Sequence, residues 1–424
     1  MTATAIEDTP GLLDAVRDRF AHVERCPISG PRVFFENAGG ALTLKSVVET
    51  SGFYAAIPDN QGRANDTAHE LVRVIAASKA RMATFFNASA GQFFVGESGT
   101  ELLFRLVRTA LAGTPAGVVL GSSVEHPATR SAARHWAGIL GKTYVSVAHD
   151  DEKGLATAEA YAAQVTPDTR VVTILHTSPV TGMGMNIAAI ARAVRATAPD
   201  AFIIVDGIQH ACHGQIDIDA AGIDGYVVSP YKVFSRHGYG VAWVSDRLTA
   251  LPHERLAGGP EENWEFGTRD TGAYATFADV IAYFDWLGGE VSGETDPRAR
   301  IEAAGAAIHA QETALTDAAL HGTGNQRGLA EMPGVHVIGG IDNPAREGLV
   351  SFWADAMPAE DIVAALNAEG IRTHTRKADH YSGNILDPLG QSACVRVSFC
   401  HYNSRAEVAR FLTALDAILG RPSA

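Results

Sequence analysis

Cysteine is scarce in this chain: its 424 residues include only Cys26, Cys212, Cys394 and Cys400. None of the four has CxxC spacing to another, so the sequence offers neither a disulfide framework nor a zinc-ribbon pattern. Isolated cysteines of this kind are typical of reduced thiols. We therefore expect a protein that works in a reducing compartment.

Long hydrophobic runs and excess positive charge are also absent. No run approaches the ~18–20 apolar residues of a membrane-spanning helix. The first residues, MTATAIEDTPGLLDAV, lack the apolar segment of a signal peptide. Lysine and arginine total 34 against 48 acidic residues, for a net charge of −14, which argues against nucleic acid or an anionic membrane as partner. These absences predict a soluble, cytoplasmic protein.

The composition is that of a well-packed globular protein. Hydrophobic residues make up 46% of the chain and charged residues 19%. The order of the predicted elements divides the chain into an N-terminal helical segment (residues 1–30), a large domain (31–290) and a small C-terminal domain (291–424). Within these we expect a helix over residues 10–25, a hinge at 288–294 and a last helix that begins at the capping box Ser404-x-x-Glu407.

The segment 201–240, AFIIVDGIQHACHGQIDIDAAGIDGYVVSPYKVFSRHGYG, carries the clearest chemistry. Two apolar runs read as buried parallel strands, the first ending at Asp206 and the second leading into Lys232. Ligands of open α/β sheets bind at this end of the strands. A lysine that forms a Schiff base and a carboxylate that keeps a pyridine nitrogen protonated suit pyridoxal phosphate (PLP), and Gln209 could reach its phenolic oxygen. Without further information, the same residues are also compatible with an ordinary aspartate at a strand end and a solvated surface lysine that bind no cofactor.

The same segment resembles the lysine region of class V (fold-type I) PLP enzymes. The shared order is Asp-Gly-x-Gln, His-Gly before Ile-Asp, Ser-x-x-Lys, then a glycine turn and a strand. It is most similar to the cysteine desulfurase-like and isopenicillin N epimerase-like branch. The resemblance covers about nine-tenths of the chain. It implies an α/β fold: a fold-type I large domain with a mostly parallel sheet, plus a small C-terminal α+β domain.

The resemblance also assigns roles. It implies that Lys232 is the PLP lysine and base, that Asp206 pairs with the pyridine nitrogen, and that His126 stacks on the ring as a third catalytic group. It implies substrate binding by Asn37 and by Arg396, which would hold the α-carboxylate, and a homodimer with shared sites. The phosphate would be held by Gly99, Thr100, Ser229, Tyr231 and, from the partner subunit, Thr268.

Two departures from the family pattern bear on the reaction. Where desulfurases have Ser-Asn, this chain has Ser178-Pro179, which removes a side-chain donor. No cysteine occurs between Cys212 and Cys394, where desulfurases carry the thiol that accepts sulfur as a persulfide. Basic and hydroxyl residues stand there instead: Arg372, His374, Arg376, Lys377, His380 and Tyr381. We therefore expect a β-eliminating lyase of the C–S type acting on an amino acid, with transamination or epimerisation as alternatives.

Rival interpretations predict different chemistry. The run His210-Ala211-Cys212-His213 has metal-ligand residue types but no evident fourth ligand, so we expect no metal. Ser229 and Lys232 also form an S-x-x-K pattern, typical of serine acyl-enzymes, without the accompanying S-D-N and K-T-G tripeptides. A third alternative is a protein of this fold that binds the cofactor without turnover.

Overall fold

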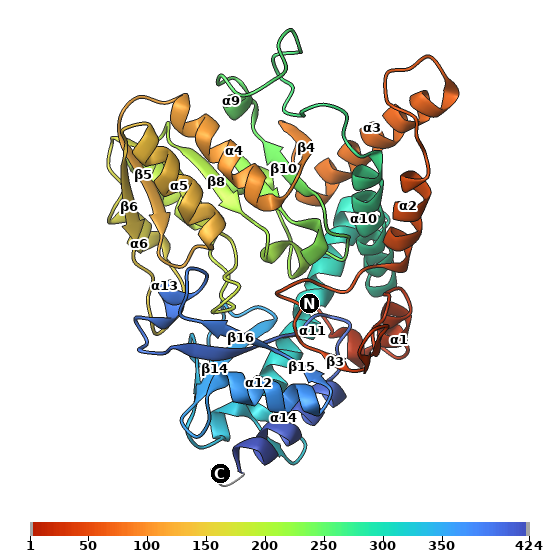
Figure 1. Ribbon diagram of the computed structural model, residues 1–424, viewed down its shortest axis with the longest axis vertical. Coiled ribbons are helices and arrows are strands. Elements are labelled where there is room, and N and C mark those ends of the chain that lie inside the picture. Colours follow the sequence, from red (N-terminus) through yellow and green to blue (C-terminus); the bar gives the residue numbers. More distant parts are fainter. Residues whose placement is uncertain (1–2, 421–424) are drawn as a thin grey trace.

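A seven-stranded sheet is the largest sheet of the computed structural model, which describes residues 3–420 (Figure 1). The strand order is β4-β10-β9-β8-β7-β5-β6, and β10 alone runs antiparallel to its neighbours, so the predicted mostly parallel sheet is confirmed. The strands are β4 (Gln92–Gly96), β5 (Val118–Ser122), β6 (Thr143–Val147), β7 (Thr169–Leu175), β8 (Phe202–Asp206), β9 (Gly225–Val228) and β10 (Gly240–Val244).

Both faces of this sheet are buried, which explains its continuous apolar strands. Alternate residues, such as Ile204 and Val227, pack under α4 (Gly99–Ala112) and α5 (Pro127–Ile139). The other set, such as Ile203 and Val228, joins the largest core, on the opposite face. The helices that contribute to that core include α3 (Asp66–Phe86), α7 (Ile187–Thr197) and α10 (Thr271–Val291).

A second, antiparallel sheet lies in the lower half of Figure 1. Its order is β13-β14-β17-β16, and helices pack against it as expected for the small α+β part. The strands are β13 (Val335–Val337), β14 (Leu349–Ala354), β16 (His374–Lys377) and β17 (Ala393–Ser398), and the helices are α12 (Ala359–Ala368) and α14 (Arg405–Leu419).

The connection between the sheets begins later than the sequence predicts. Residue Gly288 lies inside α10, and the chain leaves the helix only at Ser292 before α11 (Pro297–His321) begins. A side chain at Gly288 would collide with the backbone of Arg300, so glycine serves close packing of α10 on α11 here and does not serve as a hinge. The division into domains at residue 290 stays a proposal.

The predicted helix over residues 10–25 is wrong in its extent. The helix α1 (Leu12–Arg17) has six residues, after the short 3₁₀ helix η1 (Ile6–Asp8). The chain then extends, because Phe20 forms a β-bridge with Leu44 and β1 (Arg25–Cys26) pairs with β2 (Gly30–Pro31). Helical spacing of apolar residues here reflects burial of Val16 and Phe20 on later elements and not a continuous helix.

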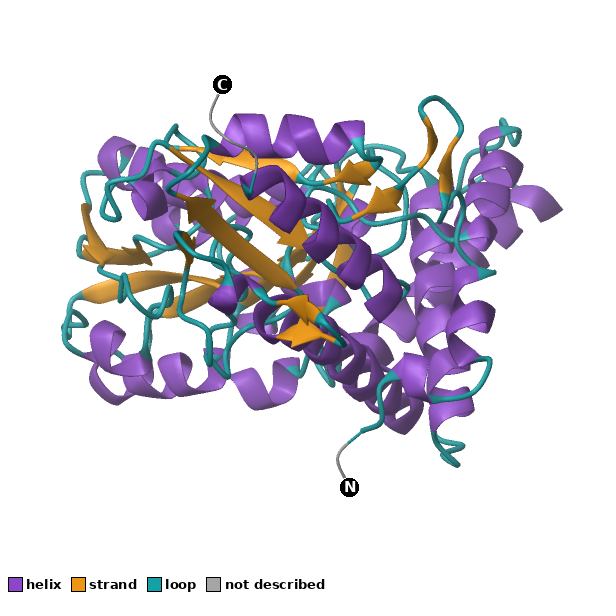
Figure 2. Ribbon diagram, turned by 90° about the horizontal axis from the view of Figure 1, so that it is seen from below, coloured by secondary structure: helices purple, strands orange, loops and turns teal. Residues whose placement is uncertain are grey.

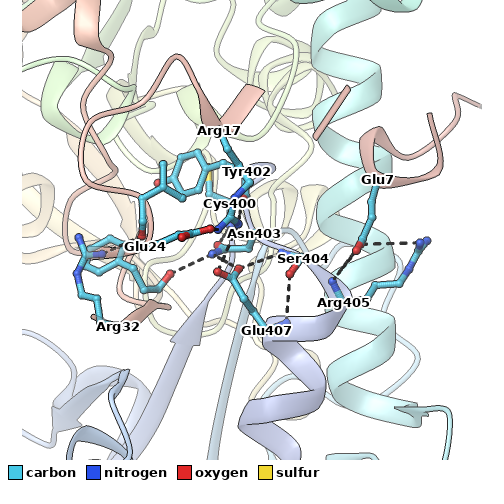
Figure 3. Close-up of polar contacts among 12 residues, drawn as sticks. Glu7, Arg17, Glu24, Arg32, Cys400, Tyr402, Asn403, Ser404, Arg405 and Glu407 are labelled. Carbon is cyan, nitrogen blue, oxygen red and sulfur yellow. Dashed lines mark hydrogen bonds and ion pairs between the residues drawn. The ribbon is translucent and has the colours of Figure 1, made fainter. Parts of the chain in front are cut away.

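This N-terminal segment is bound to the start of the last helix (Figure 3). The backbone N–H of Arg405 donates to Glu7, and Arg17 forms an ion pair with Glu407. The predicted capping box is confirmed, since Ser404 and Glu407 each accept from the other's backbone N–H. Just after this segment, strand β3 (Val33–Phe34) pairs with β15 (Ile371–Arg372) and adds a further contact to the C-terminal part.

Helices lie on both sides of the strands when the molecule is seen from below (Figure 2). Within residues 3–420, no helix is both long and apolar enough to cross a membrane. The remaining elements are α2 (Lys45–Ala55), α6 (Ala158–Ala162), α8 (Ile218–Ala221), α9 (Asp246–Thr249), α13 (Gly383–Leu386), η2 (His210–Cys212), η3 (Pro230–Lys232), η4 (Leu329–Glu331), β11 (Gly322–Thr323) and β12 (Gln326–Arg327).

Candidate functional site

The site lies where the parallel strands β8 and β9 end. Asp206 is the last residue of β8 and pairs in register with Val227 of β9. Strand β9 is followed directly by Ser229 and then by η3. The short helix η3 ends at Lys232, and the amine of that residue reaches Gln209, three residues after the end of β8. The sequence prediction that Asp206 and Lys232 share one crevice therefore agrees with the sheet topology.

Lys232 is a buried amine. Only 8% of the residue is exposed, and its Nζ donates to Oε1 of Gln209 over 3.3 Å. Burial, reinforced by the nearby Arg396, lowers the pKa of Lys232 to about 8. A lysine of this kind is partly neutral near physiological pH, as a nucleophile or a base must be.

Behind Gln209 lies a chain of buried polar groups that sequence analysis missed. The amide nitrogen of Gln209 lies 3.2 Å from Nε2 of His213, whose Nδ1 lies 2.8 Å from Glu312 on α11. Burial opposes a charged imidazole, but the neighbouring Cys212 and Glu312 outweigh it and raise the pKa of His213, so Nδ1 carries a proton that faces the carboxylate. No local pattern reveals this chain, because Glu312 stands 99 positions from His213.

Asp206 is held by a hydroxyl and a backbone amide. Its carboxylate accepts from Oγ1 of Thr129 over 2.8 Å and from the N–H of Ile208 over 3.1 Å. The residue is 1% exposed, and burial raises its pKa. No ion pair within residues 3–420 includes Asp206, although Lys232 acts on it through space, so a positively charged ring nitrogen would supply the direct cationic partner that it lacks.

The predicted phosphate contacts fall into two groups. Gly99, the first residue of α4, lies against Ser229, and any larger side chain there would collide with its Oγ. Thr100 is exposed on the first turn of the same helix. The N–H groups of a helix N-terminus beside a serine hydroxyl suit an anion.

Tyr231 and Thr268 lie differently. The ring of Tyr231 stacks on His237 with centroids 4.3 Å apart. Thr268 is exposed in a loop whose neighbour Arg269 forms an ion pair with Glu97, close in sequence to the α4 N-terminus. Both phosphate assignments stay predictions.

His126 is the N-cap of α5. Its Nδ1 accepts from the N–H of Ala128 over 3.2 Å. Burial, with repulsion from Lys232 and Arg376, lowers its pKa to about 3, so the ring is neutral at pH 7. A neutral, half-buried imidazole suits stacking better than acid catalysis.

The two residues predicted to bind substrate differ in how many of their side-chain polar atoms already form hydrogen bonds within the protein. Asn37 donates to the carbonyl of Ser398 over 2.7 Å, and its own oxygen accepts from Tyr402, so its amide serves the protein itself. Arg396 is 2% exposed, donates from Nη1 to the carbonyl of Pro179 over 3.0 Å, and has an Nε without a partner. The proline that departs from the family pattern thus positions this arginine through its backbone.

The rival motifs gain no support from the geometry. His210 contacts Glu347 over 2.8 Å while His213 contacts Glu312, so the two imidazoles of the HACH run serve different carboxylates. Glu312, Cys400 and His401 do group within 4.8 Å, but His401 already lies 2.6 Å from the Tyr283 hydroxyl. Among the described residues, the hydrogen-bond partner of the Lys232 amine is Gln209 and not Ser229, against an S-x-x-K acyl-enzyme.

Comparisons with known proteins agree with this arrangement. The sequence model of the family "Aminotransferase class-V" matches residues 33–411. The chain is 27% identical to a probable cysteine desulfurase of Xylella fastidiosa (strain 9a5c), over 95% of this chain and 94% of that one. It is also 27% identical to the cysteine desulfurase-like protein ustD of Aspergillus flavus, over 99% and 94% of the two chains.

Solved structures share the fold. The cysteine desulfurase CsdA of Escherichia coli superposes with a TM-score of 0.76 at 21% identity, covering 96% of this chain and 98% of its own. The cysteine desulfurase of Thermococcus onnurineus NA1 gives the same TM-score and identity, with 92% and 94% covered. The α/β fold with a mostly parallel sheet is therefore shared with these enzymes.

Proposed function

The chain belongs to the class-V aminotransferase family of PLP-dependent enzymes, and from this premise we propose that it binds pyridoxal phosphate and cleaves an amino acid by β-elimination. The observation that carries the proposal is the pair of buried, oppositely charged groups at adjacent strand ends, Asp206 and Lys232, each held by its own neutral partner. A fold alone would not specify this chemistry.

The residues of the site fit the cofactor. Asp206 would pair with the pyridine nitrogen, Lys232 would hold the aldehyde carbon, and Gln209 already lies beside that lysine. The N-terminus of α4, with Gly99 against Ser229, would receive the phosphate. When bound, pyridoxal phosphate supplies an electron sink for the bonds of the substrate's Cα.

The chain's own groups would then move the proton and orient the substrate. Lys232, whose pKa of about 8 leaves part of the amine neutral, takes the α-proton. Arg396 binds the α-carboxylate through the guanidinium edge that Pro179 leaves free. His126, neutral at pH 7, forms one wall of the ring site.

A persulfide mechanism is disfavoured by the thiols. The thiol next to the arginines is Cys394, which lies opposite Arg376 on the neighbouring strand. Burial raises its pKa to about 12 despite both arginines, so it stays protonated and is a poor acceptor of sulfur. We therefore propose a desulfurase-like lyase that releases the sulfur group directly.

The reaction balances with water as co-reactant. An S-substituted cysteine, R–S–CH2–CH(NH3+)–COO−, loses its α-proton to Lys232 and its C–S bond breaks, with the electron pair leaving on sulfur. The thiolate takes up a proton, and hydrolysis of the remaining three-carbon unit gives pyruvate and ammonium. The products are thus R–SH, pyruvate and NH4+.

We further propose a homodimer in the cytoplasm. Exposed apolar side chains gather on α2 and α3, which suits a second copy of the chain, and Thr268 would complete the partner's phosphate site. The four cysteines are all free, as expected in a reducing compartment.

The decisive experiment is the visible absorption spectrum of the purified protein with added pyridoxal phosphate, beside Lys232→Ala. We expect a yellow band that borohydride bleaches and that the variant lacks. A protein that stays colourless would refute the cofactor, and labelling of Ser229 by an acylating probe would then favour the serine enzyme.

Product analysis separates the remaining alternatives. Incubation of the coloured enzyme with S-substituted cysteines should release thiol, pyruvate and ammonium in equal amounts. Keto-acid formation only with an amino acceptor would indicate transamination, and inversion at Cα would indicate epimerisation. Cofactor binding without any turnover would indicate a protein that has lost activity.

A further inference from the structure

A second arginine shares the face of the C-terminal sheet that carries Arg396. Arg376 on β16 lies opposite Cys394 on β17, two residues from Arg396 along the same strand. Alternate residues of a strand point to the same side, so Arg376 and Arg396 share one face. This face meets the loop that follows β7 of the large sheet, because Arg396 donates to the carbonyl of Pro179 there.

Arg376 also lies close enough to affect the site electrostatically. Burial is the largest cause of the lowered pKa values of Lys232, His126 and Arg396, and repulsion from Arg376 adds to it in all three. The guanidinium lies 5.8 Å from the ring centroid of Tyr381, which is 6.0 Å from that of His126. Arg376 therefore lies on the side of the proposed site that is formed by Tyr381 and His126.

Among residues 3–420 Arg376 forms no ion pair, although Asp379 lies near enough to favour its charged form through space. Its Nε donates to Ser382 over 2.9 Å, while its Nη2 is buried without any hydrogen bond. Within residues 3–420 no carboxylate lies within ion-pair distance of Arg376 or of Arg396, whereas the neighbouring His374 and Lys377 pair with Glu36 and Glu360. An unpaired guanidinium is costly to desolvate, so a bound anion would stabilise both the buried Arg396 and the partly buried Arg376.

We propose that Arg376 binds a second acidic group, so that the substrate is an amino acid whose side chain ends in a carboxylate or a similar oxyanion. The proposal rests on the proposed function, in which Arg396 takes the α-carboxylate. The two guanidinium groups on one sheet face would then bind the two acidic ends of the substrate, each through planar N–H groups that match an oxyanion. The phosphate of the cofactor would not compete for Arg376, because the predicted contacts of that phosphate lie at Gly99 and Ser229.

The test uses the holoenzyme and changes one charge of the ligand at a time. The visible band of the bound cofactor is titrated with L-aspartate against L-asparagine and with L-glutamate against L-glutamine, pairs of nearly equal size. We expect the better acidic ligand to bind at least ~10-fold more tightly than its own amide, as a charge-assisted hydrogen bond contributes. The variant Arg376→Gln should abolish that difference and leave the affinity for the amide unchanged.

Two further variants make the result specific. Lys377→Gln removes an adjacent, exposed charge that pairs with Glu360, and it should retain the preference. Arg396→Gln should weaken acid and amide alike, with circular dichroism showing that each variant is folded.

Other results decide against Arg376. Equal affinity for acid and amide, a preference that survives Arg376→Gln, or no spectral response to any of the four ligands would overturn the proposal while leaving the yellow enzyme intact. A protein without the yellow band would instead refute the proposed function.

Discussion

The imidazole of His213 donates toward Glu312 across 2.8 Å, in a part of the molecule where both side chains are at least 98% buried. His213 follows strand β8 of the large sheet, whereas Glu312 belongs to α11, the helix that leads to the C-terminal sheet. Through Gln209 this pair reaches the amine of Lys232. The connecting helix therefore helps to hold the side chain that contacts the central lysine.

This arrangement predicts unequal effects of two substitutions at Glu312. Glu312→Leu leaves the Nδ1 proton without an acceptor in a site closed to water, and we expect it to lower the free energy of unfolding by about 1–3 kcal/mol. Glu312→Gln retains an acceptor oxygen and should cost less. Urea unfolding of both variants measures the difference, and equal stability of the two would contradict the assigned contact.

The hydroxyl of Thr129 offers a second test, at Asp206. Thr129→Val keeps the shape but removes the hydrogen bond that favours the ionised carboxylate, so the pKa of Asp206 should rise further. We expect roughly tenfold weaker binding of pyridoxal phosphate, the equivalent of ~1.4 kcal/mol. Fluorescence titration of the apoenzyme measures it, and Thr129→Ser, which retains the hydroxyl, should bind nearly as well as the wild type.

Much of the framework could be predicted because apolar runs and caps are local signals. The strand ends at Asp206 and before Ser229, and the capping box at Ser404, follow from short patterns in the sequence. Thr129, Glu312 and Arg376 could not be assigned in this way, because their contacts are set by helices and strands that meet only in the folded chain. The short α1 was missed for the same reason, since burial of Phe20 imitates a helical pattern.

The proposed dimer can be tested at the exposed phenylalanine of α2. Phe53 is 62% exposed, and Val48 on the same helix and Val72 on α3 are each about half exposed. Phe53→Glu would place a charge in an apolar contact, so we expect dissociation to monomers by light scattering after size exclusion. Ile139 is equally exposed, at 60%, but lies at the end of α5, on the other side of the molecule (Figure 1), and Ile139→Glu should leave the dimer intact. Monomeric wild-type protein would contradict the dimer itself.

The buried carboxyl of Glu125 predicts a pH dependence of stability. It directly precedes His126 in the sequence, accepts from Thr173 over 2.9 Å, and has its pKa raised to about 8, chiefly by burial. Because the folded state holds the proton more tightly than the unfolded chain, this favourable contribution is complete below pH 4.5, the ordinary pKa, and is lost as the pH rises through about 8. Each unit of pKa difference corresponds to ~1.4 kcal/mol, so the loss should reach a few kcal/mol. Glu125→Gln keeps a neutral hydrogen-bonding side chain at every pH, and its free energy of unfolding should therefore decline less than that of the wild type between pH 5 and 9. Parallel curves for the two proteins in urea unfolding would show that Glu125 ionises at its ordinary pH and that the site tolerates its charge.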